Sequence, residues 1–250
     1  MKRFGAALAG AAAFLLLAAP ANAATTLVVF SSTGMQAALT EIQPIYERHT
    51  GNKLDLTFLT TNMLKDKIDQ GAAFDVAILL PPVIDPLIQA GKLGPHMVPL
   101  AKSGLGIATK AGVPAPDLST PDAFKAALLA AKGVAYTTTG QSGLYFAKLL
   151  DQWGITDQIK AKSMTIATGS TASFVANGQA DIAIQLIPEL KAVPGVQVVP
   201  FPEAVQNYLK FQGGISPASK HKKTASAFLK FLSSPAAIKV IKAKDMEPGN

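Results

Sequence analysis

The fold is decided by residues 27–62, LVVFSSTGMQAALTEIQPIYERHTGNKLDLTFLTTN. Residues 27–30 form a short apolar run that predicts a buried strand, which opens into a polar turn. Apolar side chains then recur at helical spacing and predict a helix over 35–48. Apolar and polar residues alternate over 54–58, which predicts a second strand, and the polar turn 60–62 follows it. The order is therefore strand, polar turn, helix, strand, polar turn.

The same unit of apolar strand, Ser/Thr/Gly/Asn turn and helix recurs along the chain. It occupies 27–35, 54–63, 133–144 and 164–174. Alternation of strands with helices favours an α/β fold with a mostly parallel sheet. Residues 98–109 alternate between apolar and small side chains, and we expect this segment to cross between two lobes.

The N-terminus has the pattern of a secretory signal. Lys2 and Arg3 precede an almost purely apolar run over 4–19, and residues 21–23, Ala-Asn-Ala, have the small-x-small form of a cleavage site. The apolar run is short for a bilayer span, which needs roughly 20 residues. We therefore predict a cleaved signal peptide over 1–23 and a protein of the periplasm. The alternative is an N-terminal anchor that is retained.

Charge and composition bear on the partners. The chain has 23 Lys+Arg against 16 Asp+Glu, a formal net charge of +7, and no Cys. The basic residues are scattered apart from 220–223, and no aromatic residues interleave with them, so we expect no binding to nucleic acid. A mild positive balance favours anionic ligands through electrostatic steering. Without Cys, an exported chain depends on its core rather than on disulfides.

Catalytic motifs are not evident in the sequence. The histidines are His49, His96 and His221, none with an obvious partner, and the patterns HExxH, GxSxG and CxxC do not occur. Asp75 and Asp181 each begin an apolar strand, where we expect capping or inter-segment hydrogen bonds rather than paired catalytic carboxylates. We therefore predict a protein that binds without catalysing, with no cofactor and no metal.

The recurring polar turns predict a ligand site. A helix N-terminus presents free backbone N–H groups and a partial positive charge, and Ser or Thr hydroxyls add donors that rotate to suit an acceptor. Turns at the carboxyl ends of parallel strands converge on the crevice where open α/β sheets bind ligands. A small anion could be held there by neutral dipoles. Each turn taken alone is also explained as an ordinary helix cap.

Segments spread over nearly the whole mature chain resemble the molybdate-binding periplasmic protein family. They are 27–35, the break at 50–51, 60–62, 68–76, 141–147, 177–183 and 228–235. The resemblance implies the two-lobed type II periplasmic binding fold, with a ligand cleft between the lobes and an ABC permease in the inner membrane as partner. We expect one lobe from 24–103 plus 206–250, the other from 104–205, and a monomer.

The resemblance also implies a ligand held by hydroxyls and backbone amides. By position, the family's two serines fall on Gly34 and Thr61, and its amide contacts fall on Ser142 and near Thr168. The family's cleft tyrosine falls on Leu186. The expected ligand-binding residues are Ser32, Thr33, Gly34, Thr60, Thr61, Ser142, Tyr145, Thr168 and Gln185.

Gly34 and Leu186 each remove a hydroxyl donor that the family has, and unmatched donors decide selectivity. A molybdate- or tungstate-like oxyanion is the first expectation for the ligand. A small organic carboxylate bound by the same fold is the alternative, as is an exported enzyme of unknown class, which would need a nucleophile–base pair. The sequence does not separate a role in transport from one in sensing.

Overall fold

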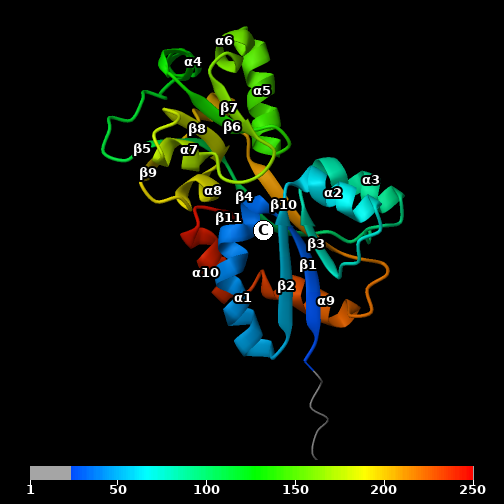
Figure 1. Ribbon diagram of the computed structural model, residues 1–250. Coiled ribbons are helices and arrows are strands. Elements are labelled where there is room, and N and C mark those ends of the chain that lie inside the picture. The colour runs from blue at the N-terminus through cyan, green and yellow to red at the C-terminus, as the bar shows by residue number, and fades with distance from the viewer. Residues whose placement is uncertain (1–23, 250) are drawn as a thin grey trace, which may run out of the picture.

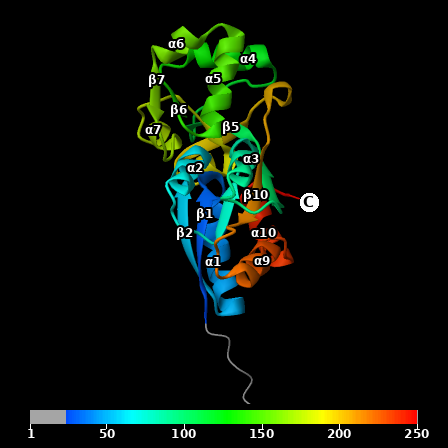
Figure 2. The same ribbon diagram turned by 90° about the vertical axis from the view of Figure 1, so that its right-hand side faces the viewer.

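Two sheets, each flanked by helices, make up residues 24–249, the part of the chain that the computed structural model describes (Figures 1 and 2). The predicted signal peptide, residues 1–23, lies outside the described residues. The first lobe contains β1 (Thr26–Ser32), η1 (Thr33–Met35), α1 (Gln36–Thr50), β2 (Lys53–Leu59), α2 (Thr61–Asp69), β3 (Val76–Leu79), α3 (Pro81–Gln89), β4 (Val98–Ser103), β10 (Leu209–Ile215), α9 (Lys222–Phe231), α10 (Pro235–Ala243) and β11 (Glu247–Pro248). The second contains β5 (Leu105–Lys110), α4 (Pro121–Ala130), β6 (Val134–Thr137), α5 (Gln141–Trp153), α6 (Thr156–Lys160), β7 (Ser163–Ile166), α7 (Ala172–Ala176), β8 (Ile182–Leu186), α8 (Ile187–Lys191), β9 (Val196–Pro200) and η2 (Glu203–Val205).

Both sheets are mixed. The first has the order β11-β4-β10-β3-β1-β2, in which β1 is parallel to β2 and β3, and β10 is antiparallel to β3 and β4. The second has the order β7-β6-β8-β5-β9, with β6 parallel to β7 and β8, and β5 antiparallel to β8 and β9. The two-lobed α/β fold is confirmed. In each lobe one strand next to a crossing is antiparallel to both of its neighbours. This strand is β10 in the first lobe and β5 in the second.

Alternate residues of the central strands face two different helical layers. In β1, Leu27 and Val29 join the cluster that includes α1, whereas Phe30 joins the cluster built with α2 and α3. β3 alternates in the same way, with Ile78 on the first face and Leu79 on the second. Successive side chains of a strand point to opposite faces, so a strand covered on both sides is apolar throughout. This explains why these strands are continuous apolar runs in the sequence.

Several elements differ from the sequence-based expectation, and three of these differences bear on the sheets and the site. The first is β10, which contains Gly213 and Gly214 and was not predicted, because paired glycines are typical of turns. A Cβ at Gly213 would lie 2.4 Å from a Leu229 methyl carbon, so this strand needs glycine where α9 packs against the sheet.

The other two differences concern helix starts. The apolar run 180–187 predicts a strand, but the strand ends at Leu186 because Pro188 begins the short helix α8. The sequence also predicts a helix from Leu144, whereas α5 begins at Gln141, inside the polar turn. The turn residues Gln141 and Ser142 are therefore the first turn of a helix.

Asp75 ties two segments of the first lobe together, as the sequence predicts. Its carboxylate accepts hydrogen bonds from the backbone N–H of Val28 (2.9 Å) and from the hydroxyl of Ser219 (2.6 Å), and its side chain is buried. Asp181 acts similarly in the second lobe, where it accepts from the N–H of Lys132 at 2.7 Å. Both aspartates are inter-segment hydrogen-bond acceptors.

Substituting Asp75 by alanine should destabilise the protein by about 2 kcal/mol, because the N–H of Val28 and the hydroxyl of Ser219 lose a charged acceptor in a buried place. Urea unfolding of Asp75→Ala and of wild type measures this difference. The matched control is Asp181→Ala, whose carboxylate accepts a single backbone bond at an exposed position and should cost less. An equal loss for both variants would contradict the burial argument.

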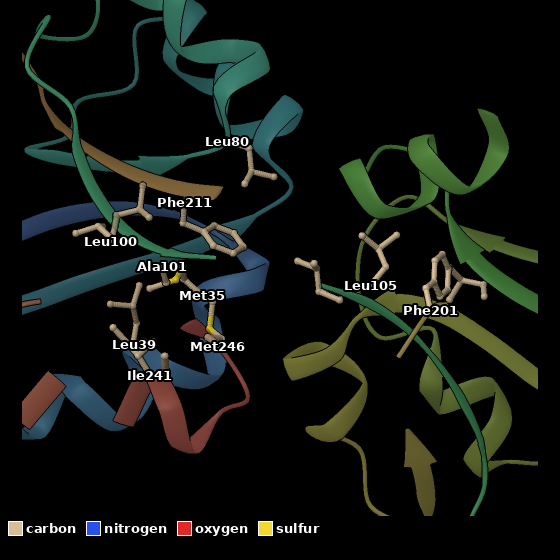
Figure 3. Close-up of a cluster of buried hydrophobic side chains, with 14 of the residues drawn as sticks. Met35, Leu39, Leu80, Leu100, Ala101, Leu105, Phe201, Phe211, Ile241 and Met246 are labelled. Carbon is tan, nitrogen blue, oxygen red and sulfur yellow. The ribbon is translucent and has the colours of Figure 1, made fainter. Parts of the chain in front are cut away.

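The two crossings between the lobes lie side by side. The side chain of Gln206 accepts from the N–H of Leu105 (2.7 Å) and donates to the Leu105 carbonyl (3.0 Å), so the outgoing chain at β5 is bonded to the returning chain. Leu105 and Phe201 both belong to the large core cluster and lie on the same side of it in Figure 3, away from Met35 and Phe211 of the first lobe. None of the described helices is long and apolar enough to cross a membrane.

Candidate functional site

The polar turns predicted from sequence lie where parallel strands end. Ser32 of β1 pairs with Leu59 of β2, so the chain after each strand, at Thr33 and Thr60, emerges at the same edge of the first sheet. In the second sheet Thr137 pairs with Ile166, and the turns that follow β6 and β7 also share an edge. These two edges face each other across the junction of the lobes (Figure 1).

A pocket of about 680 Å³ opens at this junction. Its wall from the first lobe is the start of α1 with Thr33 and Gly34, and its wall from the second lobe includes Ser170, Gln185 and Glu189. Its volume falls within the range of roughly 300–1,000 Å³ that is usual for small-molecule sites. Three of the residues predicted for the ligand, Thr33, Gly34 and Gln185, therefore line one pocket.

On one flank of this junction the lobes touch through hydrogen bonds. The hydroxyl oxygens of Thr60 and Thr139 lie 3.2 Å apart, and the side-chain amide of Asn62 donates to the Thr139 carbonyl at 3.2 Å. Gln141 donates to the side-chain oxygen of Asn62 at 3.5 Å. The starts of α2 and α5 are thus held together.

On the other flank an ion pair joins the lobes. The ammonium group of Lys191, at the end of α8, lies 2.8 Å from the carboxylate of Asp245, which follows α10. Both side chains are about half exposed, so this pair contributes at most about 1 kcal/mol. Contacts on both flanks show that the structure describes a conformation in which the lobes are close.

Gly34 is covered by apolar side chains. A Cβ at this position would come 2.5 Å from the ring of Phe211 and 2.7 Å from a methyl carbon of Leu186. Both side chains are buried, with 1% and 3% of their surfaces exposed. The space that a serine would need at position 34 is therefore already filled.

Three buried hydroxyl oxygens near the strand ends have no hydrogen-bond partner among the described residues. They belong to Thr61 at the first position of α2, Thr137 at the end of β6, and Ser170 in the loop before α7. Burying a hydroxyl without a partner costs about 1–3 kcal/mol. Of these three residues, Ser170 lines the pocket described above, whereas Thr61 and Thr137 do not.

The start of α5 supplies backbone donors beside one of these hydroxyls. Gly140 is the N-cap and no side chain caps the helix. The first intrahelical bond is made by the N–H of Leu144, so the N–H groups of residues 141–143 precede it. A Cβ at Gly143 would lie 2.8 Å from the Thr137 hydroxyl oxygen, which places that hydroxyl against the first turn of α5. Ser142, a predicted ligand residue, is 4% exposed in this turn.

The remaining predicted residues have other partners or positions. The hydroxyl of Tyr145 donates to the Val205 carbonyl at 3.0 Å, which ties α5 to the returning crossing. Gln185 holds the loop before α7, since its side-chain oxygen accepts from the N–H of Thr171 (3.0 Å) and its amide donates to the Gly169 carbonyl (3.0 Å). Thr168 is exposed on that loop, and Ser32 is buried at the end of β1. Thr60 acts as the N-cap of α2 as well as bridging the lobes.

Sequence reasoning missed Glu189. This residue is the third of α8, where a glutamate can reach back to the N-cap backbone. Burial raises the pKa of Glu189 to about 7, and the Thr33 hydroxyl, the Leu186 backbone and the Gln185 side chain partly offset that rise. The segment Leu186-Ile187-Pro188-Glu189 contains the signal, because Pro near a helix start followed by Glu predicts a capped helix rather than more strand.

The raised pKa of Glu189 predicts how stability depends on pH. Below the ordinary pKa of 4.5 the carboxyl is protonated in both the folded and the unfolded chain. Between 4.5 and about 7 only the folded protein keeps the proton, so stability falls as the pH rises through this window. The loss is on the order of 1–3 kcal/mol.

Urea unfolding from pH 5 to 8 should show this decline in wild type and a flatter profile in Glu189→Gln. Glu203→Gln, at an exposed glutamate, should keep the wild-type slope, and identical slopes in all three proteins would contradict the assignment.

Comparisons with known proteins agree with this architecture. Residues 27–247 match the model of the bacterial extracellular solute-binding protein family. An aconitate isomerase of Pseudomonas sp is 32% identical over 247 residues, which cover 94% of each chain. Among solved structures, the periplasmic molybdate-binding protein of Azotobacter vinelandii superposes with a TM-score of 0.75 at 19% identity, over 88% of this chain and 98% of that one. PEB3 with bound L-phospholactate superposes with a TM-score of 0.65 at 18% identity, over 88% of this chain and 99% of that one. This chain belongs to the bacterial extracellular solute-binding protein family.

Proposed function

We propose that this protein binds a small organic polycarboxylate of the aconitate kind in the pocket between its lobes. In this proposal it is exported by a cleaved signal peptide and delivers the ligand to an ABC permease in the inner membrane. The observation that carries the proposal is the pocket at the facing edges of the two sheets, which is lined by Ser170 with its unpartnered buried hydroxyl. The unpartnered hydroxyls of Thr61 and Thr137 lie at the same edges, outside the lining of the pocket. Carboxylate oxygens are acceptors that match these donors and the free N–H groups of α5.

The charged side chains that line the pocket are two lysines and two acids. Lys191 and Lys244 line it, although each is paired with an acid, Asp245 and Glu41 respectively. Because both lysines already have acid partners, neutral dipoles balance most of the ligand charge in this proposal. The relative that is 32% identical is named for a tricarboxylate, which agrees with this chemistry.

A polycarboxylate fits the pocket better than a tetrahedral oxyanion does. The pocket of about 680 Å³ is far larger than a five-atom ion needs. Of the three positions where the molybdate-binding family has hydroxyls, Thr61 keeps one and Gly34 and Leu186 do not. The side chains of Leu186 and Phe211 fill the space above Gly34. A larger pocket with an apolar cover over Gly34 favours a carbon-containing acid.

Calorimetric titration tests the proposal. We expect cis-aconitate, trans-aconitate or citrate to bind and to raise the melting temperature, because a ligand that binds only the folded state stabilises it. Molybdate, tungstate and sulfate serve as the comparison panel and should bind more weakly. Stabilisation by an oxyanion but by no polycarboxylate would overturn the choice of ligand.

Isomerisation of a bound unsaturated acid is a second candidate function, although the sequence favours binding without catalysis. It is supported by the similarity to an aconitate isomerase over 94% of both chains and by the carboxyl group of Glu189 in the pocket wall. Proton NMR of cis-aconitate incubated with the purified protein separates the two functions. A pure binding protein leaves the spectrum unchanged apart from bound-state broadening, whereas an isomerase produces the trans signals.

A further inference from the structure

Glu189 is a carboxyl group at the meeting point of both lobes. It belongs to α8 of the second lobe, while Thr33, whose hydroxyl interacts with it, belongs to η1 of the first. Both residues line the pocket, together with Gly34, Ser170 and Gln185. The carboxyl is therefore in a position to contact whatever the pocket holds.

We propose that Glu189 is the acid–base residue that moves a proton between two carbons of an unsaturated tricarboxylate bound in this pocket. The inference rests on the proposed function, because it requires that the pocket take such an acid. It adds a catalytic residue to that binding site.

The surroundings of Glu189 leave it free to exchange a proton. The other carboxylate that lines the pocket, Asp245, is paired with Lys191 at 2.8 Å. Lys244, which lines the same pocket, is paired with Glu41 of α1 at 2.7 Å. Glu189 forms no ion pair among the described residues, and the groups that interact with its carboxyl are the neutral Thr33 hydroxyl, the Gln185 side chain and the Leu186 backbone.

The ionisation of Glu189 suits this role. Burial raises its pKa to about 7, so near neutral pH the protonated and ionised forms are both present. A general acid–base residue works best when its pKa lies near the operating pH, since it must both take and return the proton.

The reaction is a proton shift along three carbons. Ionised Glu189 takes a proton from the methylene carbon of the bound acid, and the electron pair of the broken C–H bond spreads over the allylic system and its carboxylates. Protonated Glu189 then delivers the proton to the former vinylic carbon, so one C–H bond forms, the double bond moves by one position and the enzyme returns to its ionised state. Each carbon of the three-carbon chain carries a carboxylate, so moving the double bond by one position gives the same acid again. The new double bond can be cis or trans, and the shift therefore interconverts the two forms with no oxidant, water or co-reactant. The sequence contains no Cys that could isomerise the double bond by thiol addition.

Three variants test the role of Glu189. In Glu189→Gln the amide has nearly the shape of the carboxyl but cannot take a proton, so we expect isomerisation to fall by about 10²–10⁴-fold while calorimetric affinity for aconitate stays within a few-fold of wild type. Glu189→Asp keeps the acid and should recover part of the rate. Glu203→Gln, at an exposed glutamate of η2, is the control for the loss of one glutamate.

Exchange of solvent deuterium into the methylene group of aconitate gives a second readout, because proton removal is visible there even without net isomerisation. Wild type should catalyse exchange and Glu189→Gln should not. Wild-type protein that binds aconitate but neither isomerises nor exchanges it overturns the inference and leaves the binding function intact, as does undiminished exchange in Glu189→Gln. Wild-type protein that binds no polycarboxylate overturns the proposed function, and this inference with it.

Discussion

Replacing Gly143 by alanine should lower the free energy of unfolding by about 3 kcal/mol or more and abolish ligand binding. A Cβ at this position would lie 1.8 Å from the backbone oxygen of Thr137 and 2.7 Å from its carbonyl carbon. Backbone atoms of a central strand cannot move aside as the tip of a flexible side chain can. The first turn of α5 would have to shift away from β6, and with it the N–H groups that face the site.

Leu144→Ala is the matched control for this substitution. Leu144 is the next residue of α5, and 43% of its side chain is exposed, so its truncation should change stability by less than about 0.5 kcal/mol. Urea unfolding and calorimetric titration of both variants measure the two effects. A Gly143→Ala protein as stable as the Leu144→Ala protein would show that α5 is not held against Thr137 as the structure describes.

The central strands and polar turns of the fold could be predicted because their signals are local. The apolar run at 27–30 and the turn after it are explained by residues within a few positions of each other, and β1 and η1 follow them closely. The resemblance to the molybdate-binding family placed Gly34 at the junction of the lobes, and it lines the pocket there. Local pattern and position within a family were sufficient for these features.

What fills the space at Gly34 could not be predicted, because it depends on residues distant in sequence. Phe211 comes from β10, a strand whose paired glycines are typical of a turn, and Leu186 ends a strand of the other lobe. Their packing over Gly34 is a consequence of how the lobes meet. The same holds for the carboxyl of Glu189, whose burial and contact with Thr33 arise only when both lobes are present.

The predicted role of Gln185 illustrates a second limit. A buried polar residue at a strand end suggests a ligand contact, and Gln185 does line the pocket. Its side-chain oxygen, however, already accepts from the N–H and the hydroxyl of Thr171, and its amide donates to Gly169. Sequence cannot tell a satisfied polar group from an unsatisfied one. The hydroxyls without partners are therefore the better guide to the ligand.

Removing two of those hydroxyls should raise stability and lower affinity together. In Thr61→Val and Thr137→Val a methyl group replaces a buried hydroxyl that has no partner among the described residues, so each variant should be as stable as wild type or more stable by up to about 1 kcal/mol. A hydrogen bond to a charged ligand group contributes about 1.5–3 kcal/mol, which corresponds to a loss of about 10- to 150-fold in affinity per hydroxyl. The double variant should therefore bind aconitate about 10²- to 10⁴-fold more weakly than wild type.

Thr171→Val is the control that gives the opposite sign of stability change. The Thr171 hydroxyl is fully buried but donates within the second lobe, with oxygens of Gln185 and Ile184 at 2.9 and 3.2 Å, so the same change of atoms should destabilise the protein by about 1–2 kcal/mol. Urea unfolding without ligand and titration with aconitate measure both quantities on all variants. Destabilisation of Thr61→Val to the same extent as Thr171→Val would show that the Thr61 hydroxyl serves the fold rather than the ligand. A buried hydroxyl that lowers the stability of the ligand-free protein persists where ligand binding needs it. A gain in stability together with a loss of affinity in Thr61→Val and Thr137→Val therefore assigns these hydroxyls to the binding site rather than to a packing defect.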